Sequence, residues 1–192
     1  MKPIYRAESV REMDQMLIEG FGIPSHTLME VAAKKIAESI MKRYPVGNIH
    51  LACGPGNNGG DGLACARWLK IWNRRVTISV PVPPKTKDAQ LNYEYCLKLN
   101  LNPMLLDEAK ADIIIDALLG NGQKIAPRGT IASEIHAIRK AKKNGARIIS
   151  IDIPSGIDPN KGHPFDNCWV RPELTINIGE RKPGLYNSDN SG

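Results

Sequence analysis

The feature that most constrains the fold is a stretch in which an apolar run breaks into a loop of glycines and asparagines, residues 48–62. Within it, Gly54, Gly56 and Gly59 have the spacing G-x-G-x-x-G, and a helical pattern follows directly. Such a loop between a strand and a helix lets backbone amides approach an anion closely, while the helix dipole favours negative charge. The stretch therefore predicts a strand–loop–helix unit, although the motif alone does not identify a function.

Apolar runs and helical patterns alternate along the rest of the chain. Strands are predicted at 48–52, 76–82, 112–118, 147–151 and 174–178, and helices at 9–20, 25–43, 61–72, 87–99 and 131–144. Several of the apolar runs are continuous, as expected for strands buried on both faces. The alternation predicts an α/β protein with a mainly parallel central sheet, helices on both sides and N-terminal helices ahead of the sheet.

The second N-terminal helix carries apolar residues at helical spacing. These are Leu28, Val31, Ala32, Ile36, Ile40 and Met41. We expect this stripe to face the core, and a subunit interface is the alternative.

Length and composition narrow the class of protein. The 192 residues fit one domain over 1–192. No apolar run approaches the roughly 20 residues of a membrane span, and the N-terminus lacks the apolar region of a signal peptide, so we expect a cytoplasmic protein without membrane contact. The formal charge of +6 suits an anionic ligand, but the basic residues are not interleaved with aromatic ones, which argues against nucleic-acid binding. The four cysteines lack metal-site spacing and are expected to be buried thiols.

Three of the predicted strands lead into residues that could bind a ligand. The first is followed by Gly54–Asp61, the third ends at Asp116 before the loop 119–129, and the fourth is followed by Asp152–Asp158. In an open parallel sheet, ligands bind beyond the carboxyl ends of the strands. We therefore expect these three segments to meet at one edge.

Each of these carboxylates also has a purely structural alternative. Asp116 or Asp152 could form a turn, and Asp61 could be the N-cap of the helix behind it. Their occurrence together favours a site, because independent turns need not place carboxylates at the same end of successive strands.

The sequence argues against a redox dinucleotide bound in the ordinary way. That mode needs an acidic residue at the end of the second strand, about 20 residues beyond the glycines. Here the second strand ends in Val80-Pro-Val-Pro-Pro84, with no carboxylate before Asp88.

The donors that remain are oxygens. Asn58, Asp116, Ser155 and backbone carbonyls suit a hard cation rather than zinc or copper. With only one or two carboxylates available, a weakly charged ion such as potassium is favoured over calcium.

Five stretches of the chain resemble the NAD(P)H-hydrate epimerase family, also called the YjeF N-terminal domain. They are Gly22–Glu30, Gly54–Gly62, Asp116–Gly120, Ile151–Asp158 and Lys182–Leu185. The matches run in order over nearly the whole chain.

The resemblance implies a Rossmann-like three-layer αβα fold, a homodimer, and action on hydrated NADH and NADPH, which carry a hydroxyl at C6 of the reduced ring. It implies interconversion of the R and S forms, so that an ADP- or ATP-dependent dehydratase, fused or separate, can restore the cofactor. By the same resemblance, Asn58, Asp116 and Ser155 would hold potassium. The substrate would be held by Asn57, Asn58, Gly59, Gly60, Asp61, Gly120, Asn121, Gly122, Gln123, Lys124, Ile125, Ala126 and Asp152.

A mechanism follows as a hypothesis. Loss of hydroxide from C6 would leave a cation stabilised by the ring nitrogen, and water returning to the other face would invert the carbon. Asp152 is the predicted general acid/base, because a strand end beside the expected cation would hold it ionised until substrate binds. Lys124 and Arg128 could neutralise phosphates or remain solvated.

Some observations leave alternatives open. A non-catalytic scaffold or a nucleotide-binding module on the same fold is the alternative function, since relatives in mRNA decapping use the domain for assembly.

Asn121 departs from the threonine or aromatic residue common in the family, which leaves the preference between the NADH and NADPH forms open. The chain stops at residues 187–192, where family domains run on through another strand, so a fragment of a longer chain is a further alternative.

Overall fold

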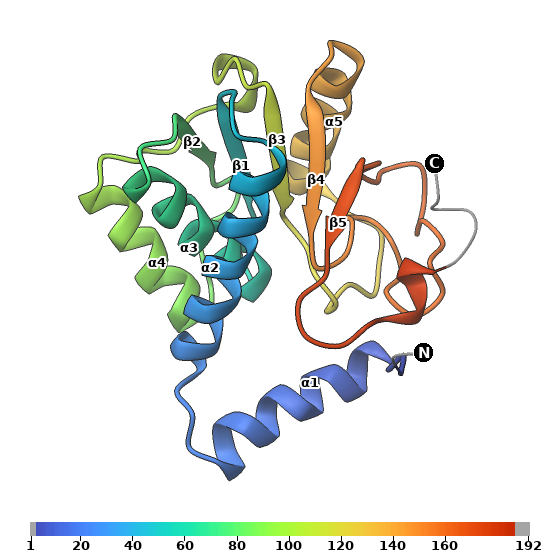
Figure 1. Cartoon of the computed structure of the whole chain (residues 1–192). Coiled ribbons are helices and arrows are strands. Elements are labelled where there is room, and N and C mark those ends of the chain that lie inside the picture. The colour runs from blue at the N-terminus through green and yellow to red at the C-terminus, as the bar shows by residue number, and fades with distance from the viewer. Residues whose placement is uncertain (1–2, 187–192) are drawn as a thin grey trace.

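The fold is a parallel sheet between two layers of helices (Figure 1). The computed structural model describes residues 3–186, so the prediction about residues 187–192 lies outside it. The strands are β1 (Ile49–Cys53), β2 (Val76–Ser79), β3 (Ile113–Ala117), β4 (Arg147–Ile151) and β5 (Leu174–Ile176). They are ordered β2-β1-β3-β4-β5, and every pairing between neighbours is parallel. The predicted Rossmann-like αβα sandwich is confirmed.

The helices cover the two faces of the sheet unequally. On one side lie α2 (Ser25–Arg43), α3 (Asn57–Ile71) and α4 (Lys87–Lys98), and on the other lies α5 (Gly129–Lys143) (Figure 1). Short 3-10 turns occur at Leu106–Glu108 and Pro183–Leu185. Successive residues of β1 point to opposite faces, so Leu51 joins the core under α3 while Ala52 joins the core under α5. The described cysteines are free and buried, as predicted.

Helix α3 begins earlier than the sequence pattern predicts. It starts at Asn57, with Gly56 as its N-cap, and Asp61 lies inside the helix. Of the two alternatives for Asp61, the role as N-cap is therefore wrong. Glycine makes the early start feasible, because a Cβ on Gly59 would lie only 1.8 Å from the carbonyl oxygen of Gly54.

The predicted strand at 76–82 is also too long, since β2 ends at Ser79. Pro81 and Pro83 lack the N–H that would continue the ladder.

The buried face of α2 differs from the predicted stripe. It consists of Met29, Ala33, Ile36, Ala37 and Ile40. Val31 is 59% exposed, so its assignment to the core is wrong. The helix presents Met29 to α3 instead, where a Cβ on Gly60 would come within 2.7 Å of the Met29 methyl group.

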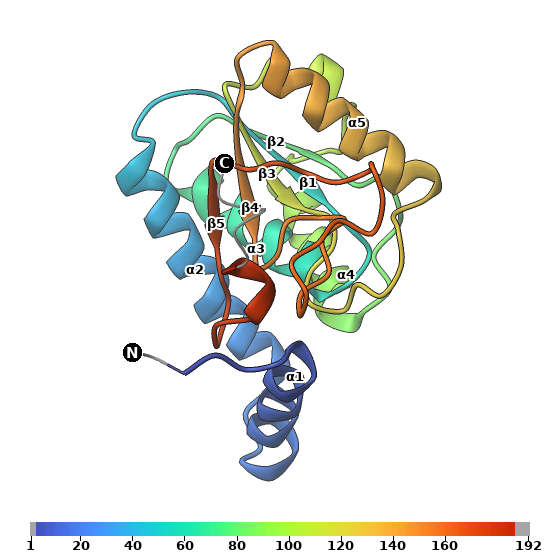
Figure 2. The same ribbon diagram turned by 90° about the vertical axis from the view of Figure 1, so that its right-hand side faces the viewer.

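The N-terminal helix α1 (Ala7–Gln15), extended by a π-helical turn at Met16–Gly20, lies apart from the sheet (Figure 2). Hydrogen bonds connect this N-terminal region to the C-terminal part of the domain. The Ala7 N–H donates to Asn160 Oδ1 at 2.9 Å, and the Tyr5 N–H donates to the Arg181 carbonyl at 2.8 Å. In residues 3–186 no helix is long and apolar enough to cross a membrane.

Candidate functional site

A cavity of about 690 Å³ lies at the carboxyl edge of the sheet. Its walls come from α1, the start of α3, the loop after β3, the end of β4 and the segment after β5. The predicted substrate residues in its lining are Asn57, Asn58, Asp61, Gly120, Asn121, Gly122, Gln123, Lys124, Ile125, Ala126 and Asp152. The three loops predicted to share an edge therefore do so.

Gly59 and Gly60 are the exceptions. Both are buried outside the cavity lining and pack against Gly54 and Met29. Their structural contribution is to let α3 approach the loop and α2 closely.

Asp116 and Ser155 are both fully buried. The Ser155 hydroxyl donates to Asp116 Oδ1 at 2.6 Å, and the Ser155 N–H and Ser150 hydroxyl donate to Asp116 Oδ2 at 2.9 and 2.7 Å. Burial raises the pKa of Asp116, and these hydrogen bonds act against that rise. The parallel pairing of β3 with β4 places Asp116 opposite Ser150 and so brings these groups together.

Asn58 connects this buried cluster to the cavity. Its Nδ2 donates to the Leu119 carbonyl at 2.9 Å, and the Leu119 N–H donates to Ser155 Oγ at 2.9 Å. Asn58 Oδ1 is buried and has no hydrogen-bond partner among residues 3–186. Leaving such an oxygen unpaired costs about 1–3 kcal/mol, unless a ligand satisfies it.

This donor set fits potassium. A chain of hydrogen bonds runs from Asn58 Nδ2 through Leu119 and the Ser155 hydroxyl to Asp116, and only one of these four residues is a carboxylate. Over residues 3–186, no group of three or more His, Cys, Asp or Glu side chains is arranged to hold a metal ion. A hard cation of low charge is the ion that such oxygens prefer.

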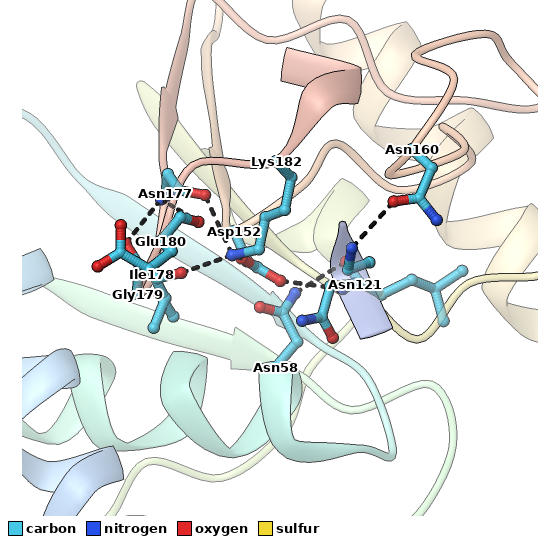
Figure 3. Close-up of polar contacts among 11 residues, drawn as sticks. Asn58, Asn121, Asp152, Asn160, Asn177, Ile178, Gly179, Glu180 and Lys182 are labelled. Atoms are coloured by element: carbon cyan, nitrogen blue, oxygen red, sulfur yellow. Dashed lines mark hydrogen bonds and ion pairs between the residues drawn. The ribbon is translucent and has the colours of Figure 1, made fainter. Parts of the chain in front are cut away.

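Asp152 lies at the end of β4, with a φ of +67° that non-glycine residues rarely adopt. Its Oδ2 accepts a hydrogen bond from the Asn121 N–H at 2.9 Å, and its Oδ1 pairs with Lys182 Nζ at 2.5 Å. A Cβ on Gly120 would lie 3.0 Å from both Asp152 Oδ2 and the Asn58 Cβ, so that loop runs close to both residues. Figure 3 shows Asn58 and Asn121 beside the Asp152–Lys182 pair.

Two further carboxylates line the cavity. Burial, followed by the charges of Asp152, Asp14 and Asp88, raises the pKa of Asp61 well above its usual range. Burial likewise raises the pKa of Asp14, which α1 supplies, and the Lys182 charge opposes that rise. Burial thus raises the pKa of both further carboxylates, and perturbed carboxylates gathered in one cavity are typical of functional sites.

The cavity also contains residues that sequence reasoning missed. They are Val10, Arg11, Asp14, Thr86, Leu118, Leu119, Ile131, Ile178 and Lys182. Lys182 belongs to a stretch that carries the family resemblance. No other feature of the sequence indicated that Lys182 lies in the site. No sequence feature indicated that residues of α1 line the cavity, because nothing in the sequence indicates that α1 docks on the segment after β5.

The fold and the cavity define a Rossmann-like α/β protein whose ligand site lies beyond the carboxyl ends of its strands. The family model described as YjeF-related protein N-terminus matches residues 25–184. The chain belongs to this family.

Named relatives agree with that assignment. The chain is 34% identical to a protein named NAD(P)H-hydrate epimerase from Limosilactobacillus fermentum, over 93% of this chain and 86% of that protein. It is 37% identical to a protein named bifunctional NAD(P)H-hydrate repair enzyme Nnr from Archaeoglobus fulgidus, over 87% of this chain but only 35% of that protein. The crystal structure of the yeast protein ynu0 (YNL200c) superposes with a TM-score of 0.87 at 24% identity, covering 95% of this chain and 83% of the yeast chain, which shows the shared fold.

Proposed function

We propose that this protein is an isomerase that interconverts the R and S forms of hydrated NADH and NADPH. The observation that carries the proposal is the cavity at the carboxyl edge, which gathers the residues of three family-like stretches around Asp152. Relatives that match nearly the full chain are named for this activity.

The reaction needs a proton delivered to and removed from oxygen at C6. Protonation of the C6 hydroxyl lets the C–O bond break, water leaves, and the lone pair of the ring nitrogen stabilises the resulting cation. Attack by water on the opposite face forms the new C–O bond, and loss of a proton restores neutrality. Asp152 is our candidate for the proton transfers, because its carboxylate lines the cavity and is held by two donors.

Potassium is the proposed cofactor, held by Asn58, Asp116 and Ser155. The unpaired Asn58 Oδ1 and the oxygen-only donor set support this choice. When bound, potassium would supply positive charge at the edge of the substrate cavity. Arg11, Lys124 and Arg128 also line the cavity and are the proposed partners of the substrate phosphates.

We further propose a cytoplasmic homodimer that works with a dehydratase. The Archaeoglobus relative is named as bifunctional, and most of its length lies beyond the part that this chain matches, which supports a fused or separate second enzyme. That enzyme would consume the S form.

A scaffold without catalysis is not favoured. Such a protein has no need for Asn58, Asp116, Asp152 and Ser155 to remain clustered around one cavity.

An assay with exchanged cations tests the cofactor and the activity together. Purified R-form hydrated NADH is incubated with the protein in potassium, sodium or lithium chloride, and both epimers are followed by chromatography. We expect fastest conversion in potassium, and Asn58→Ala should remove that preference. A folded protein that leaves the R form unchanged in every salt would contradict the epimerase function, whereas equal rates in all salts would contradict only the cofactor.

A further inference from the structure

Lys182 is an almost completely buried lysine in the lining of the cavity. Its side chain is 1% exposed, although it lies in a loop between β5 and the turn at Pro183–Leu185. A lysine in a loop is ordinarily solvated, because burying an ammonium group without partners is costly. Its position therefore needs an explanation.

The surroundings of the ammonium group supply one. Lys182 Nζ donates to Asp152 Oδ1 at 2.5 Å, to Asn177 Oδ1 at 3.1 Å and to the Ile178 carbonyl at 2.5 Å (Figure 3). An ammonium has three donors, so all of them are used. Lys182 has no donor left for a substrate and can act on the reaction only through Asp152.

The turn that carries Lys182 is also fixed from outside. The neighbouring Arg181 carbonyl accepts the Tyr5 N–H at 2.8 Å, and Gly179 packs against Val10 of α1. Asn177 in turn donates to the Gly179 and Glu180 carbonyls at 3.1 Å. The Lys182 ammonium group therefore has a fixed position and does not move with a bound substrate.

Other ionisable groups also surround Asp152. Asp61 from α3 and Asp14 from α1 both interact electrostatically with Asp152 and with Lys182. The cations Arg11, Lys124 and Arg128 line the same cavity. Of these charged groups, Lys182 is the one in direct contact with the Asp152 carboxylate.

We propose that Lys182 is the positioning residue of the epimerase reaction: its ammonium pairs with the Asp152 carboxylate and fixes that carboxylate in orientation against the Asn121 N–H. This inference rests on the proposed function. Asp152 is 7% exposed, so its ionised form without a cation would be strongly disfavoured. The remaining lone pairs of the carboxylate can then take up the proton that the attacking water loses when the new C–O bond forms.

The test is the pH profile of kcat/KM for conversion of the R form of hydrated NADH. In Lys182→Met, Asp152 should be protonated at neutral pH, so the acidic limb moves about 1–3 pH units upward, and the rate at pH 7 falls about 10- to 100-fold. Lys182→Arg keeps the charge and should keep the limb where it is in the wild type.

A matched control removes a different, mostly buried cation. Arg67 pairs with Glu30 and Asn92 on the helical face away from the cavity. Arg67→Met should lower the thermal midpoint while leaving the acidic limb unmoved, which separates a structural role from a positioning role.

A second variant covers failure of Lys182→Met to fold. In Asp152→Asn/Lys182→Met both charges are gone, so no uncompensated buried charge remains. Its residual rate should equal that of Asp152→Asn alone, because Lys182 has nothing further to position. A clearly lower rate, or wild-type rate and limb in Lys182→Met, would overturn the inference. Failure of the wild type itself to interconvert the epimers would instead overturn the proposed function on which it rests.

Discussion

Asp152 combines an unusual backbone with two fixed carboxylate contacts. A φ of +67° at a non-glycine residue carries strain of the order of 1–3 kcal/mol, which the surrounding structure must offset. The Asp152 N–H donates to the Ile176 carbonyl at 2.8 Å, and the side chain is held by Asn121 and Lys182. Strain of this kind is concentrated at functional positions, which supports Asp152 as the centre of the site.

Replacing Asp152 by asparagine should therefore abolish most of the activity. The amide keeps the shape but cannot accept a proton, so kcat for R-to-S conversion should fall about 10²- to 10⁴-fold. Asp107→Asn, at an exposed aspartate that lies in the turn Leu106–Glu108 and pairs with Lys140 of α5, serves as the control and should retain the wild-type rate. Wild-type kcat in a folded Asp152→Asn protein would show that another group carries the proton.

The sequence predicted some site residues and missed others for identifiable reasons. Asn58, Asp116, Asp152 and Ser155 were predictable, because they follow apolar runs and the ends of parallel strands meet at one edge. Lys182 lies beyond β5 and reaches Asp152 through a loop whose path the pattern does not predict. Asp14 was not predictable either, because it reaches the cavity only when α1 docks on the segment after β5. That docking depends on contacts such as Ala7 with Asn160, far apart in the sequence.

At the scale of elements, the junction of β1 and α3 fixes the shape of the cavity. The order of strand, loop and helix was predicted correctly here, but the start of the helix was not, since asparagines and glycines have low intrinsic helix propensity. Tertiary contact overrides that propensity: Gly59 fits against Gly54, and Gly60 fits against Met29. The early start carries Asn58 to the Leu119 carbonyl.

Gly59→Ala tests this close approach. Its Cβ would meet the backbone oxygen of Gly54 at 1.8 Å, and backbone cannot move aside as a flexible side chain can. We expect a loss of about 1–3 kcal/mol in the free energy of unfolding, measured by urea denaturation. Gly56→Ala has open space around its Cβ and should change stability far less. Equal stabilities of the two variants would contradict the tight packing at this junction.

At the scale of the whole molecule, a buried polar network ties the sheet to α5. His50 on β1 contacts the Thr77 hydroxyl at 2.8 Å and the Ser79 hydroxyl at 2.9 Å, and the Ser79 hydroxyl donates to Glu134 of α5. Burial lowers the pKa of His50 to about 4. Burial also raises the pKa of Glu134.

This network predicts acid sensitivity of the fold. The unfolded chain binds a proton at His50 below its usual pKa of 6.5, whereas the folded protein does so only near 4, so stability is lost as the pH falls through this window. The loss attributable to His50 between pH 7 and pH 4 is about 3 kcal/mol. Glu134 has the opposite dependence, because its raised pKa favours proton uptake by the folded state.

The contribution of His50 to the loss of stability at acid pH is measured by urea denaturation of variants across this pH range. His50→Gln should flatten the decline in stability relative to wild type, while His136→Gln at an exposed position of α5 should leave it unchanged. An unaltered decline in His50→Gln would show that the acid sensitivity arises elsewhere.

The architecture as a whole was more predictable than its details. Continuous apolar strands separated by helical patterns determine a parallel sheet, and the strands paired as this requires. What the pattern could not predict is which face each helix presents, as Val31 illustrates, or that α1 completes the cavity. Both depend on how elements pack after the strands have paired.

The central claim is that this cavity inverts the C6 centre of hydrated NADH by loss and return of water. The most direct measurement starts from pure R form in water labelled with heavy oxygen and follows the S form by chromatography and mass spectrometry. The S form should appear and carry solvent oxygen at C6, at a rate far above that of the Asp152→Asn protein. An S form that keeps its original oxygen would contradict the mechanism, and no S form above the uncatalysed background would contradict the function.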